Sequence, residues 1–444
     1  MKKIYRNNWL ICLALLLFVS CNNDDGEVLF DQSPADRLAE QNEVLLNLLT
    51  TEPQGYKALY FSKNDEFGGF TYYMKFNTDG TVRMTSDFDE DTDIQTSSYD
   101  VRTGTTTELV FTTRNHIQKV SNPDYPGLVG TGFKGTSVFQ FFSEEEGVIT
   151  FRDVRNTSTG ILILTPTNFS DFDTESLASV ETSLVNRENF TTSDAVTSFP
   201  FLSVENGSEV DRYALNYNNV TLFANPTKQD ASGAVTDEEF GIAFTEDGLV
   251  ISPALEVNGV AFENFLLDDS SGLQYVSVVD GVTAKIGYGN TPVTPLDPYA
   301  FGERRNFAIF NDLELEKSSN AFLSFYQDYT AQLESFYGLT INFVYFVGLN
   351  DGTQPILVFA TNFGNFLFGL DFEVNDGVVV FTDTGLSNTS AGNKAIFQPL
   401  IDVFIGGPSG FYLNNTGNLD IYSNRTFSMI SVADPTIEIN YYDQ

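Results

Sequence analysis

Side chains able to do acid–base or metal chemistry are unevenly supplied in this 444-residue chain. Asp and Glu together number 60, but His116 is the only histidine and the cysteines are Cys12 and Cys21. One imidazole cannot build a zinc site that needs two, and any Ser-His-Asp triad would have to use His116. The chain has no G-x-S-x-G segment, and Arg114–Ile117 is typical of the end of a strand. We therefore expect His116 to be a surface or turn residue and not a catalytic base.

The abundant carboxylates leave one hydrolytic reaction open. Hydrolysis of a glycoside needs only two carboxyl groups at the right separation, and a working pair cannot be recognised among 60 acidic residues in one sequence. A carboxylate-dependent, glycosidase-like hydrolase is therefore an alternative interpretation. The chain has neither a Walker loop nor a G-x-G-x-x-G segment after a strand, so we expect no cofactor.

Carboxylates alternate along one short segment, as they do in a calcium-binding loop. Asp87, Asp89 and Asp91 would be the ligands there. The sixth position of this loop is Thr92, where an EF-hand needs glycine, and the twelfth is Ser98, where it needs glutamate. We expect a solvated acidic loop without a metal, and weak calcium binding is the alternative.

Aromatic side chains could form a binding platform. The chain has 20 Tyr and 41 Phe, and flat rings of this kind can stack on sugars. Tyr72, Tyr73, Tyr441 and Tyr442 include neighbours that point to opposite faces of a strand, so one ring of each pair could face outward and bind a ligand. The alternative is that these rings form cross-strand pairs within a sheet, and we expect the phenylalanines to lie in the core.

The charge balance argues against one class of partner. Lys and Arg together number 23 against 60 acidic residues, which gives a formal net charge of −37. Such a charge opposes extended contact with nucleic acid phosphates or with an anionic membrane surface. We expect no nucleic acid partner.

Residues 1–20 have the three parts of a secretory signal peptide. Basic residues come first, an apolar run spans Trp9 to Val19, and the small residue Ser20 precedes Cys21. The apolar run is about 11 residues, short of the roughly 20 that a membrane-spanning helix needs, and no later segment is apolar for as long. We therefore expect no transmembrane helix in the mature chain.

The segment Phe18-Val19-Ser20-Cys21 resembles the lipobox of bacterial lipoproteins, with Phe18 in place of the commoner leucine. The resemblance implies cleavage before Cys21 and lipidation of its thiol, which holds a protein to a membrane without spanning it. Residues 21–32 would then be a polar tether. Asn22–Gly26 resembles the acidic export signal that Bacteroidetes lipoproteins carry to reach the exterior face of the outer membrane. The alternatives are a plain secreted protein and aspartates that merely solvate a linker.

The pattern of residues 33–170 predicts a helix followed by a β domain. Ser33 can cap this helix with Pro34 in its first turn, and apolar residues recur at helical spacing until Pro53. From Gly55 to about Thr165, short runs rich in Phe, Tyr, Val, Ile and Thr alternate with Gly, Asn and Asp, which is typical of strands.

Residues 171–444 form the second predicted unit, which is β-rich with helices near 320–337 and 393–404. We expect the boundary between the units within 166–200 and a further break within 289–300. The fold class is therefore mainly β with a few helices, as two antiparallel meander or partial-barrel domains, each with a packed helix.

An Asp-Gly hairpin signal recurs in Phe76–Val82, Phe244–Val250 and Phe372–Val378. A helix followed by strands and such a hairpin occurs near both ends of the chain. Duplication is one explanation of this recurrence, and convergence of hairpin chemistry is the other.

Several segments together resemble the DUF4302 family of Bacteroidetes lipoproteins. These are the lipobox, Phe30–Leu38, Gly55-Tyr56 and Gly69–Val82, and the likeness is densest over residues 30–165. The family has no established activity and therefore no functional residues to transfer. The resemblance implies a context of outer-membrane uptake pairs of the SusC and SusD type.

These observations predict a lipid-anchored outer-membrane protein that faces the cell exterior. We expect a non-catalytic accessory that captures a glycan or peptide ligand or supports a nutrient-uptake complex, with a SusC/SusD-type pair as partner. The alternatives are a purely structural interaction subunit and the carboxylate-dependent hydrolase.

Overall fold

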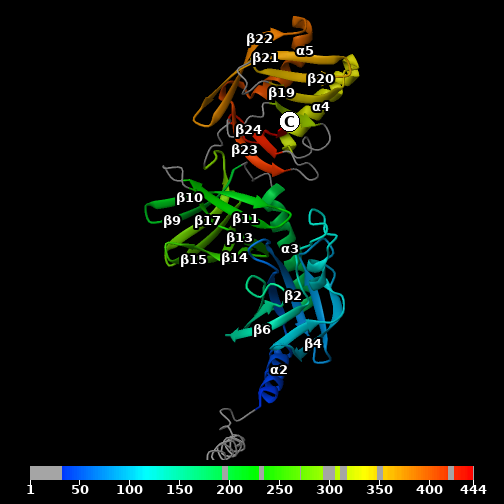
Figure 1. Ribbon diagram of the computed structural model, residues 1–444, viewed down its shortest axis with the longest axis vertical. Helices are drawn as coiled ribbons and strands as arrows, with labels where there is room; N and C mark the ends of the chain where they lie inside the picture. Colours follow the sequence, from blue (N-terminus) through cyan, green and yellow to red (C-terminus); the bar gives the residue numbers. More distant parts are fainter. Residues whose placement is uncertain are drawn as a thin grey trace, which may run out of the picture.

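The computed structural model describes residues 33–192, 199–229, 235–270, 272–293, 306–310, 318–347, 354–418 and 425–443. Strands predominate in these residues and form three antiparallel sheets in sequence order, accompanied by α-helices. The three units follow one another along the long axis of the molecule, from blue to red in Figure 1. The helices of the described ranges include none that is long and apolar enough to cross a membrane.

The first unit is a closed barrel that begins with helix α2 (Pro34–Thr51). Ser33 is the N-cap of this helix, because its Oγ accepts a hydrogen bond from the backbone N–H of Asp36 at 3.2 Å. Each strand pairs with its sequence neighbour, and β8 returns to β1 to close the sheet. The strands are β1 (Tyr56–Phe61), β2 (Gly69–Phe76), β3 (Thr81–Ser86), β4 (Gln95–Thr103), β5 (Thr107–Phe111), β6 (Val138–Glu145), β7 (Val148–Asp153) and β8 (Ile161–Pro166). The short 3₁₀ helix η1 (His116–Ser121) follows β5.

The second unit follows helix α3 (Phe172–Thr192) and is a nine-stranded sheet in the order β10-β9-β17-β16-β15-β14-β13-β11-β12. β10 also pairs with β11, which joins eight of these strands into a ring and leaves β12 attached to β11. The strands are β9 (Phe199–Asn206), β10 (Glu209–Asn218), β11 (Phe223–Gln229), β12 (Val235–Asp237), β13 (Phe240–Thr245), β14 (Gly248–Val257), β15 (Val260–Asp268), β16 (Gln274–Val279) and β17 (Val282–Gly289).

The third unit is a second closed barrel, in which β25 pairs back with β18. Its strands are β18 (Asn306–Phe310), β19 (Ile341–Val347), β20 (Ile356–Thr361), β21 (Gly364–Asn375), β22 (Val378–Ser387), β23 (Phe411–Asn418), β24 (Arg425–Ser431) and β25 (Glu438–Asp443). Helix α4 (Asn320–Tyr337) precedes β19, and α5 (Ala391–Ile405) with the 3₁₀ turn η3 (Gly407–Ser409) connects β22 to β23.

Each unit is filled by its own apolar side chains. The clusters are rich in aromatic rings, for example Tyr60, Tyr72 and Phe139 in the first unit, Phe244, Phe262 and Tyr275 in the second, and Phe346, Phe359 and Phe368 in the third. Full burial of one such side chain contributes roughly 1.5–3 kcal/mol, so each core is a large source of stability. The phenylalanines named here lie in the core, as predicted, but the prediction is wrong for Phe142, Phe336, Phe343 and Phe363, which are exposed.

The predicted hairpins form at the expected Asp-Gly pairs. Gly80 follows β2 with φ of +81°, and Asp376 and Gly377 between β21 and β22 have φ of +50° and +77°. Two consecutive residues with positive φ are the requirement of the tight turn whose twist matches antiparallel strands. The third hairpin differs, since Glu246 and Asp247 form the turn between β13 and β14, and Gly248 is the first residue of β14, with φ of +152°.

The first and second units pack closely through β2, β13 and helix α3. A Cβ on Gly68 would lie 2.3 Å from the carbonyl oxygen of Leu222, and one on Gly241 would lie 2.3 Å from that of Phe67. Glycine is therefore required at both positions, since any side chain would push the two backbones apart. The Gly68 N–H also donates to the carbonyl oxygen of Thr221 at 2.8 Å. The two units thus meet through backbone contacts and not only through side chains.

The structure confirms a mainly β chain with antiparallel barrel-like sheets, but residues 171–444 hold two sheets and not one unit. Helices α4 and α5 lie where the sequence predicts them, and Ser319 is the N-cap of α4. The predicted break at 289–300 coincides with the end of the second sheet. Residues 1–32, with the leader, Cys21 and the tether, lie outside the described residues.

Candidate ligand-binding cleft

Helix α3 holds the first two units together with a stripe of mainly small and polar side chains. The stripe comprises Phe172, Ser176, Val180, Ser183, Asn186 and Phe190, all buried and spaced three or four residues apart. The Asn186 side chain donates to the carbonyl oxygen of Thr245 at 2.8 Å, and Ser183 Oγ lies 2.8 Å from that of Phe244. The Asn186 bond satisfies a backbone carbonyl of β13, so a polar residue is suited to this helix face.

Asp87 is buried where β3 ends, beneath α3. Its carboxylate accepts hydrogen bonds from the backbone N–H of Thr71 at 2.8 Å and from the hydroxyl of Ser183 at 2.6 Å. Burial raises the pKa of Asp87 to about 6, although the nearby charge of Arg187 and these hydrogen bonds oppose the shift. Asp87 therefore connects the barrel to α3 and does not face solvent.

The other acidic residues of this loop are bound by a lysine. Nζ of Lys119, from η1, lies 2.6 Å from Oδ1 of Asp89 and 3.1 Å from Oδ2 of Asp91. The same contact lowers the pKa of the Asp91 carboxyl. The three predicted calcium ligands therefore do not converge, because Asp87 points into the protein and an ammonium group occupies the other two. Across the described ranges, no three His, Cys, Asp or Glu side chains form a metal-binding group.

His116 is buried at the start of η1, which corrects the prediction of a surface residue at the end of a strand. Its Nε2 lies 2.8 Å from the carbonyl oxygen of Asp93, and its Nδ1 lies 3.0 Å from Ser86 Oγ. A carbonyl only accepts, so Nε2 carries the proton and Nδ1 accepts from Ser86. Burial lowers the pKa of His116 and favours the neutral ring. The pair is enclosed and holds the acidic loop in place.

The sequence around η1 contains a helix-start signal. Asn115 caps η1, and Gln118 three residues later bonds back to the backbone N–H of Asn115 at 2.7 Å. Asn followed by Gln at this spacing is a capping box, which marks a helix start and not a strand end.

The four tyrosines suggested as platforms are all buried. Tyr72 lies in the core of the first barrel, and Tyr73, on the opposite face of β2, packs against Phe172 and Val180 of the α3 region. Tyr441 lies in the core of the third unit, and Tyr442 is 6% exposed in β25. Tyr72 and Tyr73 do lie on opposite faces of β2, as the sequence predicts, but helix α3 covers Tyr73 on the outer face. These rings therefore form no exposed stacking surface.

A cleft of about 1050 Å³ opens above Asp87, where four separate segments meet. Its walls come from the acidic loop after β3, from η1 and the loop that follows, from α3, and from the turn between β10 and β11. The lining residues are Phe88, Asp89, Glu90, Asp91, Arg114, Gln118, Lys119, Ser121, Asn122, Tyr125, Pro126, Leu184, Arg187, Asn219 and Val220. The cleft thus lies between the first and second units, which is a common place for binding sites.

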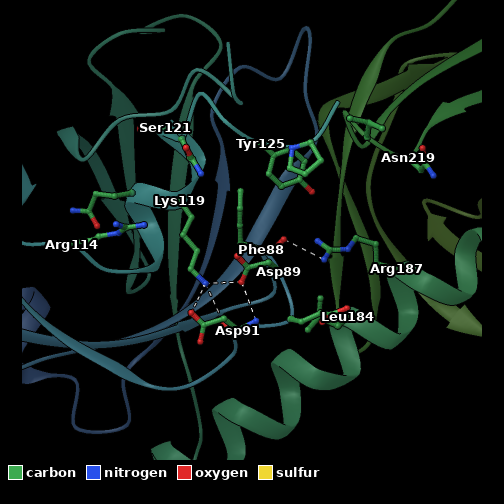
Figure 2. Close-up of a pocket in the computed structure, with 15 residues that line it drawn as sticks. Phe88, Asp89, Asp91, Arg114, Lys119, Ser121, Tyr125, Leu184, Arg187 and Asn219 are labelled. Atoms are coloured by element: carbon green, nitrogen blue, oxygen red, sulfur yellow. Dashed lines mark hydrogen bonds and ion pairs between the residues drawn. The ribbon is translucent and has the colours of Figure 1, made fainter. Parts of the chain in front are cut away.

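Arg187 reaches into this cleft from α3. Figure 2 shows its side chain extending toward Phe88, with Tyr125 and Asn219 around it and Lys119 turned toward Asp89 and Asp91. The guanidinium makes one long hydrogen bond, with Nη2 3.5 Å from the carbonyl oxygen of Phe88. It also lies 6.0 Å from the ring centre of Phe70. Among the described residues no carboxylate comes within ion-pair distance of Arg187, in contrast to Lys119.

A smaller hollow of about 180 Å³ lies on the third unit, beside the start of α5. Phe397 forms its floor, and its rim carries Tyr337 and Phe363, which are 54% and 65% exposed. This hollow is mostly apolar and has no charged lining residue. It offers little to orient a polar ligand.

The fold and the cleft together define a tandem β-barrel protein with a polar site between its first two units. Residues 26–269 match the family described as "Domain of unknown function (DUF4302)", and the chain belongs to this family. The match covers the first unit, α3 and the second unit as far as β15, and therefore includes all of the cleft.

Two further comparisons add little. A solved protein of unknown function from the DUF3598 family of Nostoc punctiforme shares 11% identity, with 56% of this chain and 93% of that chain covered and a TM-score of 0.13. A comparison with curated proteins gives no match.

Proposed function

We propose that this protein is a non-catalytic, lipid-anchored accessory that captures a ligand in the cleft between its first and second units. The observation that carries the proposal is the cleft itself, about 1050 Å³ in volume and lined by polar side chains of both signs. Its walls are held by the close backbone contacts of Gly68 and Gly241, so the site is preformed. A preformed site loses less ordering entropy when a ligand binds.

The titratable groups around the cleft favour binding over hydrolysis. A glycosidase needs an accessible carboxylic acid with a raised pKa beside a second carboxylate. The carboxyl with a raised pKa here is Asp87, which is buried and bonded to Thr71 and Ser183. Asp89 and Asp91 face the cleft but are paired with Lys119. His116, the candidate base, is enclosed with Ser86.

The proposed location rests on the sequence. The leader, the lipobox ending at Cys21 and the acidic residues after it support an outer-membrane lipoprotein that faces the cell exterior. Membership of the family supports a Bacteroidetes uptake setting with a SusC/SusD-type pair as the partner. The ligand would be a glycan or peptide that is handed to such a pair.

One set of binding measurements tests capture. The mature chain is screened on glycan and peptide arrays together with two variants, Asn219→Trp, which places an indole in the cleft, and Asn290→Trp, an exposed loop residue elsewhere in the second unit. We expect hits that disappear with Asn219→Trp and persist with Asn290→Trp. Hits that persist in both variants, or an array without hits, contradict capture in the cleft.

A second experiment tests the anchor and the partner. The tagged chain is recovered from detergent-solubilised outer membrane and compared with a Cys21→Ser variant. We expect incorporation of labelled palmitate and co-purification of a transporter pair with the parent chain only. Release of the parent chain into the medium without palmitate contradicts the proposed location.

A further inference from the structure

Three cations line the cleft in different electrostatic situations, and Arg114 is the exposed one. Lys119 is paired with two carboxylates at 2.6 and 3.1 Å, so its charge is neutralised within the protein. Arg187 makes one long bond to a neutral carbonyl and lies near a ring. Its charge acts on the buried Asp87, but among the described residues no carboxylate is within ion-pair distance of it. A guanidinium in a partly enclosed site gains from a charged acceptor, and it forms the best bonds with a planar carboxylate in a two-pronged geometry.

We propose that Arg187 anchors a carboxylate of the ligand, and that this ligand is an oligosaccharide that carries a uronic acid. The inference rests on the proposed capture function and names its substrate class. The lining supports a sugar, since Ser121 keeps an acceptor beyond its bond to Gly135, Asn122 keeps its amide donor, and Asn219 adds a side-chain amide suited to hydroxyl groups. Gln118 is committed to the backbone around η1. Tyr125 adds an aromatic ring close to Arg187.

The acidic loop disfavours ligands that carry several negative charges. Asp89, Glu90 and Asp91 line the cleft on the loop that bonds to α3, and the whole chain carries a formal net charge of −37. Lys119 neutralises part of this wall only. Repeated carboxylates along a ligand would face these side chains and be repelled. The site therefore fits a sugar with an isolated carboxylate and not a polyanion such as an oligogalacturonate.

The experiment compares three probes by titration calorimetry with the mature chain. Cellobiuronate carries one carboxylate, cellobiose differs from it by a hydroxymethyl group in that place, and trigalacturonate carries a carboxylate on every ring. We expect cellobiuronate to bind about tenfold tighter than cellobiose, as one charge-assisted contact allows. We expect trigalacturonate to bind more weakly than cellobiuronate at low salt.

Variants test whether Arg187 causes the preference for cellobiuronate over cellobiose. Arg187→Gln should bind both disaccharides alike, and Arg187→Lys should retain a smaller preference, since the charge remains and the planar fork is lost. Arg212→Gln is the control, because Arg212 stacks on Phe201 in the second unit and does not line the cleft. Melting curves show whether each variant is folded, and the comparison of probes on the parent chain needs no variant.

The outcomes separate the two proposals. Equal affinity of the parent chain for cellobiuronate and cellobiose overturns the role of Arg187 and leaves capture in the cleft standing. Binding of an acidic peptide such as Gly-Gly-Asp in place of cellobiuronate overturns the sugar as ligand class. No binding of any of these probes overturns the inference, and an array without hits overturns capture as well.

Discussion

Oδ2 of Asp87 lies 2.6 Å from Oγ of Ser183, which joins the end of β3 in the first barrel to helix α3. Ser183 also lies 2.8 Å from the carbonyl oxygen of Phe244 in the second unit. One buried carboxyl group therefore contributes to the contact that shapes the cleft. The protonation state of Asp87 should therefore affect the free energy of unfolding of the protein.

The stability of the protein should depend on pH through Asp87. Its pKa is raised in the folded protein to about 6 from an ordinary 3.8, so the folded state binds the proton more tightly than the unfolded state. Folding is then favoured below about pH 4, and this advantage is lost as the pH rises to about 6. Roughly two pKa units correspond to about 3 kcal/mol.

The measurement is denaturant unfolding of the parent chain and of Asp87→Asn between pH 4 and 8. Contributions of the other carboxyls cancel in the difference between the two proteins. We expect the parent chain to gain up to about 3 kcal/mol relative to the variant as the pH falls from 7 to 4. A difference that stays constant over this range would contradict the assignment.

Calcium should not stabilise the parent chain. Lys119 already occupies the two exposed carboxylates of the acidic loop, so a cation would have to displace it. We expect millimolar calcium to leave the melting temperature unchanged within about 1 °C, since a ligand stabilises only as far as it binds the folded state. Lys119→Ala frees Asp89 and Asp91 and should give a larger calcium-dependent rise. A rise in the parent chain that the Asp89→Ala and Asp91→Ala double variant abolishes would refute this explanation.

Removal of the Tyr60 hydroxyl should destabilise the first barrel. This group donates to Oδ2 of the buried Asp153 at 2.5 Å and accepts from the backbone N–H of Thr136 at 2.9 Å. Tyr60→Phe leaves both partners short of a bond, at an expected loss of about 1–3 kcal/mol in the free energy of unfolding. Tyr337→Phe, at an exposed ring, is the control and should change it by less than about 0.5 kcal/mol. Equal effects in chemical unfolding would exclude a special role for Tyr60.

The hollow on the third unit contains a matched pair for a packing test. Phe397 is 1% exposed and packs against Phe359 and Phe366, with ring centres 5.2 and 4.7 Å away. Phe397→Ala should cost about 3–5 kcal/mol because it leaves a cavity in the core. Phe363→Ala, on the exposed rim, should cost less than about 0.5 kcal/mol. Similar losses in denaturant unfolding would show that the rim ring is packed in solution.

Local signals in the sequence were sufficient for several elements. Ser33 and Pro34 marked the start of α2, and the Asp-Gly pairs marked three hairpins, because these depend on backbone preferences of a few residues. Helix α3 was only weakly marked, since its buried stripe includes Ser176, Ser183 and Asn186, and an apolar repeat is therefore missing. The sequence predicts a boundary between units within residues 166–200, but residues 172–192 form helix α3, which joins the first two units.

The cleft could not be predicted from one sequence. It is assembled from residues near 90, 120, 185 and 220, which are brought together only by the packing of two barrels. Asp89 and Asp91 were noticed for their spacing, but their pairing with Lys119 depends on where η1 lies. Arg187 carries no signal of its own, because what distinguishes it is that none of the ion pairs among the described residues involves it.

Ring closure has a consequence for association between copies of the protein. A strand at the border of an open sheet offers unpaired N–H and C=O groups to any neighbouring copy, and long borders of this kind template fibres. Here each unit uses its last strands to cover its first, and the attached β12 is three residues long. Neighbouring copies of the protein would therefore find few unpaired backbone groups with which to extend a sheet from one copy to the next.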